Sequence, residues 1–174
     1  MRFEHKQQFF TQGFDPDTVP WEKPQDRFDE IHNRWIKGLP YQGYGYNQFT
    51  YAGKSITPLS PASHAQIFGM WKILEQELKC EFCVCLADYY ADNTVGIPYH
   101  YDEVSSDQDL IVSVSFGATR LFQNRADLTG RVSNYILEDG DVMIFDGVSQ
   151  RLSQHCVPPM ANQSGELVNL TFRT

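Results

Sequence analysis

The chain has 174 residues, of which 41% are hydrophobic and 14% aromatic, a composition typical of one globular domain that buries its core without disulfides. Its net charge of −8 at pH 7, with no basic run, argues against tight autonomous binding to duplex nucleic acid, which depends on Lys and Arg contacts to phosphates. The sequence has neither a membrane-length apolar run nor a signal-peptide pattern, so we expect a protein of the cytoplasm or another reducing intracellular compartment, not a secreted one.

The first predicted element is a helix near residues 25–36. Phe28, Ile31 and Trp35 recur there at helical spacing, and Leu39-Pro40 ends the pattern. We expect this apolar stripe to pack against the core and to take no part in a site.

An aromatic segment interrupted by glycines follows, and it has two interpretations. Tyr44, Tyr46 and Tyr51 could belong to a lid whose rings stack on an extracted base, because enzymes that act on bases need such surfaces. The alternative is a β-hairpin with aromatic cross-strand pairs and no ligand. The residues alone favour the hairpin.

The clearest helix in the sequence runs from Pro61 to Leu78. Ser60 is a suitable N-cap, and proline suits the first helical position. Apolar residues then recur at helical spacing: Ile67, Trp71, Leu74 and Leu78. We expect this stripe to face a sheet.

Three of the four cysteines form a cluster, Cys80, Cys83 and Cys85, whose spacing is compatible with a metal knuckle. No second Cys or His pair stands at a spacing that would complete a zinc tetrahedron. The alternation from Glu81 to Leu86 indicates a buried strand instead, in which Cys acts as a small apolar residue. We therefore expect reduced core thiols.

A His-x-Asp pair, His100 and Asp102, stands just ahead of the strongly β-like run Leu110 to Phe116. In an extended strand, side chains two residues apart leave the same face, so both point into one space. A 2-His-1-carboxylate site needs a second histidine from a strand that folds back beside the first, and His155 is the candidate. The alternative is a surface turn without a metal.

Further β-like runs are separated by Gly, Asp and Asn turns, and Asp139-Gly140 is a hairpin signal. The runs lie at residues 110–116, 119–123, 132–137, 141–145 and 167–173. No βαβ alternation appears, so the predicted fold is mostly β with flanking helices, a double-stranded β-helix or jelly roll.

The last run ends in a cation, Arg173, which can pair with a carboxylate in bidentate fashion. A ligand with an acid tail needs such a partner. Two histidines, a carboxylate and this arginine together suggest an Fe(II) oxygenase with a 2-oxo acid cosubstrate.

In these residues the chain resembles the AlkB-like 2-oxoglutarate/Fe(II) dioxygenases, from about residue 44 to the end. The resemblance rests on short motifs that occur in the same order as in the family. Each motif alone is weak evidence, and the ordered set is specific. They are the lid-like aromatic segment, Asp88-Tyr89-Tyr90 in place of Asn-x-Tyr, His100-x-Asp102, Val112 to Ala118, the Leu137 to Val142 hairpin, and Asn169-Leu170-Thr171-Phe172-Arg173.

The resemblance implies roles for individual residues. His100, Asp102 and His155 would bind Fe(II) and so form the catalytic centre. The 2-oxoglutarate site would comprise Tyr90, Asn169, Thr171, Arg173 and the position of Asp88. Substrate would meet Tyr44, Tyr46, Tyr51 and Glu103, although Glu103 could equally be a solvated acid.

The implied reaction is oxidative demethylation of N-alkylated bases in single-stranded DNA or RNA, with molecular oxygen, releasing formaldehyde and succinate. An oxygenase acting on a protein or small molecule is the alternative that the acidic charge supports. A catalytically silent jelly-roll binding module is another.

Two positions depart from the family pattern. Leu167 stands where its first C-terminal arginine is expected, and Asp88 stands in place of an amide. Losing a cation and gaining an anion should weaken the binding of a dicarboxylate. A compensating cation could come from Arg120, Arg125 or Arg151.

The predicted organisation is one dioxygenase domain over residues 1–174. Residues 1–55 would form an N-terminal extension with the lid region, and residues 56–174 the helix and jelly-roll core. We expect a monomer or a domain of a larger protein.

Overall fold

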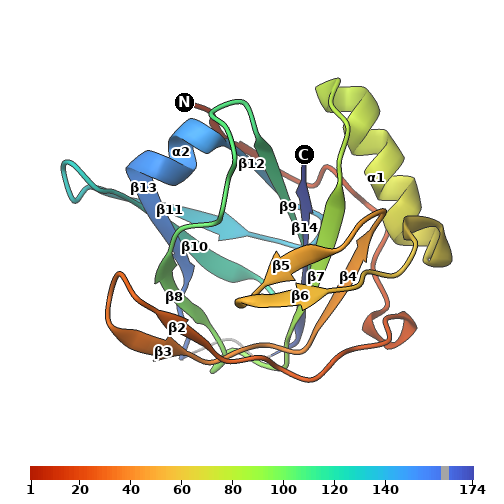
Figure 1. The fold of residues 1–174 in the computed structure, drawn as a ribbon, viewed down its shortest axis with the longest axis horizontal. Coiled ribbons are helices and arrows are strands. Elements are labelled where there is room, and N and C mark those ends of the chain that lie inside the picture. The colour runs from red at the N-terminus through yellow and green to blue at the C-terminus, as the bar shows by residue number, and fades with distance from the viewer. Residues whose placement is uncertain (162–164) are drawn as a thin grey trace.

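The computed structural model describes residues 1–161 and 165–174, and two antiparallel sheets face one another in it (Figure 1). The larger has the order β1 (Phe3–Lys6), β12 (Val142–Asp146), β9 (Leu110–Gly117), β14 (Leu167–Arg173), β7 (Val84–Tyr90) and β4 (Tyr41–Gly45). The smaller has the order β11 (Val132–Leu137), β10 (Arg120–Ala126), β13 (Ser153–Val157) and β8 (Ile97–His100). From β7 to β14 the chain passes back and forth between the two sheets, with only β10 and β11 consecutive in the same sheet, as in a jelly roll.

Side chains alternate between the two faces of the central strands β9 and β14, so one face of these strands packs in the hydrophobic core and the other lines a cavity. The outward side chains are apolar and buried: Val112, Val114 and Phe116 from β9, and Val168, Leu170 and Phe172 from β14. The inward side chains carry polar groups: Ser113 and Ser115 from β9, and Asn169, Thr171 and Arg173 from β14. The same two strands therefore build the core on one side and a polar wall on the other.

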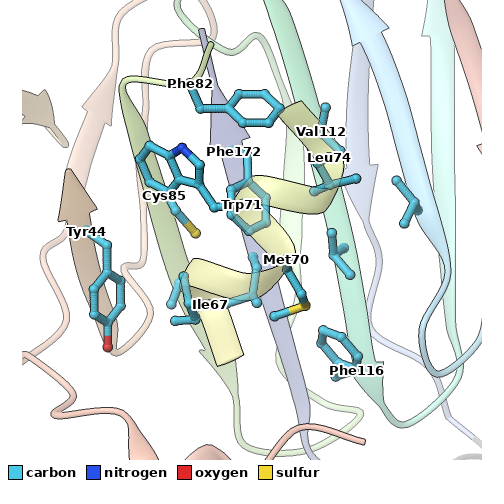
Figure 2. Close-up of a cluster of buried hydrophobic side chains, with 14 of the residues drawn as sticks. Tyr44, Ile67, Met70, Trp71, Leu74, Phe82, Cys85, Val112, Phe116 and Phe172 are labelled. Atoms are coloured by element: carbon cyan, nitrogen blue, oxygen red, sulfur yellow. The ribbon is translucent and has the colours of Figure 1, made fainter. Parts of the chain in front are cut away.

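The helix α1 (Ala65–Leu78) covers the outer face of the larger sheet. Figure 2 shows Ile67, Trp71 and Leu74 pointing from α1 into the cluster around Phe172, and all three are at most 1% exposed. Burying each contributes about 1.5–3 kcal/mol. The helix begins later than predicted, because Pro61–Ser63 form the 3-10 turn η2 and His64 caps α1 by accepting from the amide of Ile67.

The prediction of a helix over residues 25–36 is wrong. This segment is a hairpin of β2 (Arg27–Asp29) and β3 (Arg34–Ile36), and Phe28 lies opposite Trp35. The two rings pack edge to face at 5.4 Å and are 45% and 71% exposed, so they do not pack against the core. The spacing that fits a helical face also fits a cross-strand pair.

The end of the aromatic segment does form a hairpin, of β5 (Phe49–Tyr51) and β6 (Lys54–Ile56), but Phe49 lies opposite Ile56 and Tyr51 opposite Lys54, so the predicted aromatic cross-strand pairs do not form in it. The remaining elements are the 3-10 turn η1 (Pro16–Thr18) and the short helix α2 (Gly147–Leu152) between β12 and β13. Both β1 and β4 belong to the larger sheet, so the first 55 residues contribute to the jelly roll as well as to the hairpins. Among the described residues, no helix has both the length and the apolar composition needed to cross a membrane.

All four cysteines are free thiols. Cys85 and Cys156 are buried, as expected for core thiols, and Cys80 is half-buried. Cys83 is exposed, so for this residue the expectation of a core position is wrong. It lies before β7 begins, outside the alternation that buries Cys85.

Candidate active site

Three potential metal ligands meet where β8 and β13 pair. His100 ends β8, Asp102 follows in the next loop, and His155 lies at the centre of β13. The antiparallel register places His155 opposite His100, with ring centroids 4.3 Å apart. Nε2 of His100 lies 3.8 Å from Oδ1 of Asp102, and Nε2 of His155 lies 3.5 Å from Oδ2. The structure therefore brings together the three residues that the spacing singled out.

The donor atoms of this cluster fit a divalent metal ion. One ligand atom from each residue lies within 4.8 Å of the others, and no second such cluster occurs among the described residues. Nδ1 of His100 donates to the carbonyl of Pro98 at 2.8 Å, which leaves Nε2 with its lone pair toward the cluster. Two imidazoles and one carboxylate are the ligand set typical of non-haem Fe(II) oxygenases.

The electrostatics of the cluster suit metal binding. Burial lowers the pKa of His100 and lowers that of His155 to about 3. Burial alone would favour a neutral Asp102, but the charge of Arg173 and the histidine rings hold the pKa of this carboxyl below its usual range. At neutral pH the site is thus two neutral imidazoles and one carboxylate, the forms that coordinate a metal.

The inward face of β14 supplies the wall beside this cluster. Nη2 of Arg173 donates to Oδ1 of Asp102 at 3.1 Å, and its Nε is buried without a hydrogen-bond partner among the described residues. Thr171 donates to Oδ1 of Asn169 at 2.8 Å, and the amide of Asn169 donates to Oγ of Ser113 at 2.7 Å. Thr171 and Asn169 therefore hold one another in place, while Arg173 retains a donor for an anion.

The cluster and this wall share one cavity of about 370 Å³, within the size range of small-molecule sites. Asp88 and Tyr90 line it from β7, and Tyr90 is only 5% exposed. Every residue assigned above to Fe(II) or to 2-oxoglutarate lies on this cavity: His100, Asp102, His155, Asp88, Tyr90, Asn169, Thr171 and Arg173.

The predicted lid residues divide between the cavity and the outside. Tyr51 and the exposed Glu103 line the cavity. The prediction for Tyr44 is wrong: β4 directs its ring into the core with α1, where it is 1% exposed (Figure 2). The prediction for Tyr46 is also wrong, because its ring is 60% exposed, packs against Trp71 of α1 and does not line this cavity.

Sequence reasoning missed one part of the cavity and left another open. Arg27 and Phe28, from the hairpin mistaken for a helix, form part of its lining, as does the exposed Lys37 just after β3. Arg120 of β10 lies in its wall and is 1% exposed. Phe122 is apolar and shares a strand face with Arg120, which is a signal that Arg120 points inward. This signal can be used only when it is known which face of the sheet lies inside.

Comparisons with known proteins agree with this geometry. The sequence profile of the 2OG-Fe(II) oxygenase superfamily matches residues 4–173. The chain belongs to this superfamily. It is 29% identical over 167 residues to the human protein named alpha-ketoglutarate-dependent dioxygenase alkB homolog 3, and 28% identical over 167 residues to the bovine one. Each alignment covers 90% of this chain but only 57% of the relative.

A solved structure described as "The structure of OsALKBH1" matches with a TM-score of 0.54 and 22% identity, over 78% of each chain. It supports the fold, and the jelly-roll prediction is confirmed. The AlkB-like resemblance is confirmed by the named homologues. As a 2OG-Fe(II) oxygenase the chain belongs to a family of dioxygenases whose cofactors are Fe(II) and 2-oxoglutarate.

Asp88 gives this oxygenase an unusual carboxyl in the cavity wall. Burial raises its pKa to about 7, although Tyr51 donates to its Oδ1 at 3.3 Å and Arg173 adds a favourable charge. Near neutral pH a large share of Asp88 is therefore protonated. In that form it carries no charge and can donate a hydrogen bond, as the expected amide would.

Asp88→Asn should remove a pH-dependent loss of stability. Because the pKa of Asp88 rises on folding, its contribution to stability is fully present below about pH 4 and is lost as the pH rises through about 7. In denaturant titrations of the metal-free protein, the advantage of Asp88→Asn over wild type should grow across this range and then level off, on the order of a few kcal/mol. Exposed Asp107→Asn is the matched control, and parallel curves for Asp88→Asn and wild type would contradict the assignment.

Proposed function

We propose that this oxygenase removes small alkyl groups from nucleobases in single-stranded DNA or RNA. His100, Asp102 and His155 would hold Fe(II), and Arg173 and Tyr90 would bind 2-oxoglutarate, with Asn169 and Thr171 shaping that wall. The observation that carries the oxygenase chemistry is the buried His-Asp-His cluster beside Arg173 in a single cavity. With molecular oxygen, these cofactors supply the oxidant for hydroxylating a substrate C–H group.

The protein's own contribution is positioning and charge. Arg173 orients an anionic ligand next to Asp102. Hydroxylation of an N-methyl group gives a hydroxymethylamine, in which the C–N bond breaks and the carbon leaves as formaldehyde. The base then retains an N–H group.

The cavity mouth supports a nucleic-acid substrate. Phe28 and Trp35 offer exposed rings on the β2–β3 hairpin, and the cavity lining beside them includes Arg27 and Lys37. Base stacking on aromatic rings together with a few cations grips single strands without an overall basic surface. This local arrangement reconciles nucleic-acid binding with the net charge of −8. The AlkB-like resemblance points to the same substrate class.

The test is incubation with Fe(II), 2-oxoglutarate and oligonucleotides that carry one N-methylated base. We expect succinate and formaldehyde in equal amounts, with a matching loss of methyl groups from the oligonucleotide. Asp102→Ala and unmethylated oligonucleotides are the controls. Succinate formed without demethylation of any DNA or RNA oligonucleotide would instead favour a protein or small-molecule substrate.

Trp35→Ala should weaken binding of a single-stranded oligonucleotide by roughly 5- to 150-fold, because stacking is worth about 1–3 kcal/mol per base. Fluorescence anisotropy with the metal-free protein measures this directly. Tyr46→Ala is the matched control, since Tyr46 is an exposed aromatic residue on the side of α1. Equal oligonucleotide affinities of wild type and Trp35→Ala would show that the β2–β3 hairpin is not part of the binding surface.

A further inference from the structure

Arg120 is a buried cation that forms no salt bridge with any of the described residues. It begins β10, and its side chain is among the largest that are fully buried. In the part of the chain that the structure describes, its guanidinium donates only to backbone carbonyls, at 3.3 Å to that of Val95 and also to that of Asp92. Among the described residues, its Nε has no hydrogen-bond partner. The positive charge of this buried guanidinium is not neutralised by a paired carboxylate of residues 1–161 or 165–174, and an anionic ligand would neutralise it.

Arg120 lies near position 167, where the family pattern has an arginine and this chain has Leu167. Its guanidinium carbon lies 5.9 Å from the centre of the Tyr90 ring. Tyr90 is the register partner of Leu167 across β7 and β14, and both belong to one apolar cluster that Val95 adjoins. Arg120 therefore lies at the end of the cavity where the family's first C-terminal arginine is expected and this chain has Leu167.

The cavity consequently has a cation at each end. Arg173 contacts Asp102 beside the metal cluster, and in β14 it stands at the opposite end of the strand from Leu167. Arg120 lines the same cavity from the facing sheet. An extended dicarboxylate with its keto-acid end at the metal cluster would thus direct its other carboxylate toward Arg120.

The other two candidate cations are engaged elsewhere. The guanidinium of Arg125 lies 4.0 Å from the centre of the Tyr99 ring and donates to Gln154, and that of Arg151 pairs with Asp107 at the surface. Neither residue lines the cavity that holds the metal cluster.

We propose that Arg120 binds the distal carboxylate of the 2-oxo dicarboxylic acid cosubstrate, so that the anchoring cation comes from β10 of the smaller sheet in place of β14. This assignment rests on the proposed function. It makes Arg120 the residue that selects a dicarboxylate over a 2-oxo acid with an apolar tail.

The test compares 2-oxoglutarate with 2-oxopentanoate, which has the same carbon chain but ends in a methyl group. Each acid is titrated without oxygen into the Fe(II)-loaded protein, and binding is read from the visible band that appears when a keto acid chelates iron. Wild type should bind 2-oxoglutarate at least about tenfold more tightly, because hydrogen bonds to charged groups are among the stronger ones. This comparison needs no variant to fold.

Arg120→Gln should weaken the binding of 2-oxoglutarate by roughly 10- to 150-fold and leave the binding of 2-oxopentanoate unchanged. Adding Leu167→Arg to that variant should restore much of the preference, because the cation returns from β14. Arg125→Gln, a change on the opposite face of the same strand, should have no effect on either acid.

The outcomes separate the assignment from the proposed function. Equal affinity of wild type for both acids, or equal weakening of both by Arg120→Gln, would overturn the role of Arg120 and leave a structural contact with the carbonyls of residues 92 and 95. The oxygenase proposal would survive either result. No band with either acid in iron-loaded wild type would overturn both.

Discussion

Asp102→Ala should abolish the retention of Fe(II), weakening its binding by more than about 100-fold. Loss of residues that merely support metal ligands already costs about 10- to 100-fold, and Asp102 supplies the only carboxylate of the cluster. Its loss also leaves Arg173 without its anionic partner at 3.1 Å. Iron content after desalting, measured by a colorimetric chelator, gives the result.

Asp107→Ala is the matched control for this variant. Asp107 is 51% exposed and pairs with Arg151 at 2.6 Å, so its removal breaks a surface ion pair and touches no metal ligand. Such exposed pairs contribute little to stability. Iron retained by Asp102→Ala at the level of Asp107→Ala would mean that the His-Asp-His cluster does not bind the metal.

Arg173→Ala should separate cosubstrate binding from metal binding. Truncating one partner of a buried charged contact costs about 2–5 kcal/mol, so 2-oxoglutarate should bind roughly 30-fold more weakly or worse. Fe(II) should remain, because Asp102 and both histidines, the three metal ligands, are unchanged. Titration of 2-oxoglutarate into iron-loaded protein and direct iron analysis measure the two effects.

Arg151→Ala provides the corresponding control, since Arg151 is the exposed partner of Asp107. It should change neither iron content nor cosubstrate affinity. If Arg173→Ala lost iron and 2-oxoglutarate to the same extent, Arg173 would act only by holding Asp102 in place.

The metal cluster could be predicted from sequence because it depends on local geometry and one strand pairing. Side chains two apart share a face, which joins His100 to Asp102, and an antiparallel return brings His155 opposite His100. The jelly-roll strands were likewise predictable from alternation and turn residues. Strands predicted at 110–116 and 167–173, for example, lie at Leu110–Gly117 and Leu167–Arg173.

Errors arose where a pattern fits two structures. Phe28 and Trp35 match one face of a helix, yet they also face one another across a tight hairpin. The aromatic run around Tyr44 gave no sign of which ring would face the core, because that depends on where α1 covers the sheet. Arg120 could not be placed for the same reason, since strand alternation defines two faces without saying which one is inside.

The measurement that tests the central claim most directly is an anaerobic titration of 2-oxoglutarate into the Fe(II)-loaded protein. A saturable visible charge-transfer band, abolished in Asp102→Ala and weakened in Arg173→Ala, is the predicted result. Iron that is demonstrably bound without any such band would contradict the account. The cavity would then be that of a metal-binding jelly roll that does not use this cosubstrate.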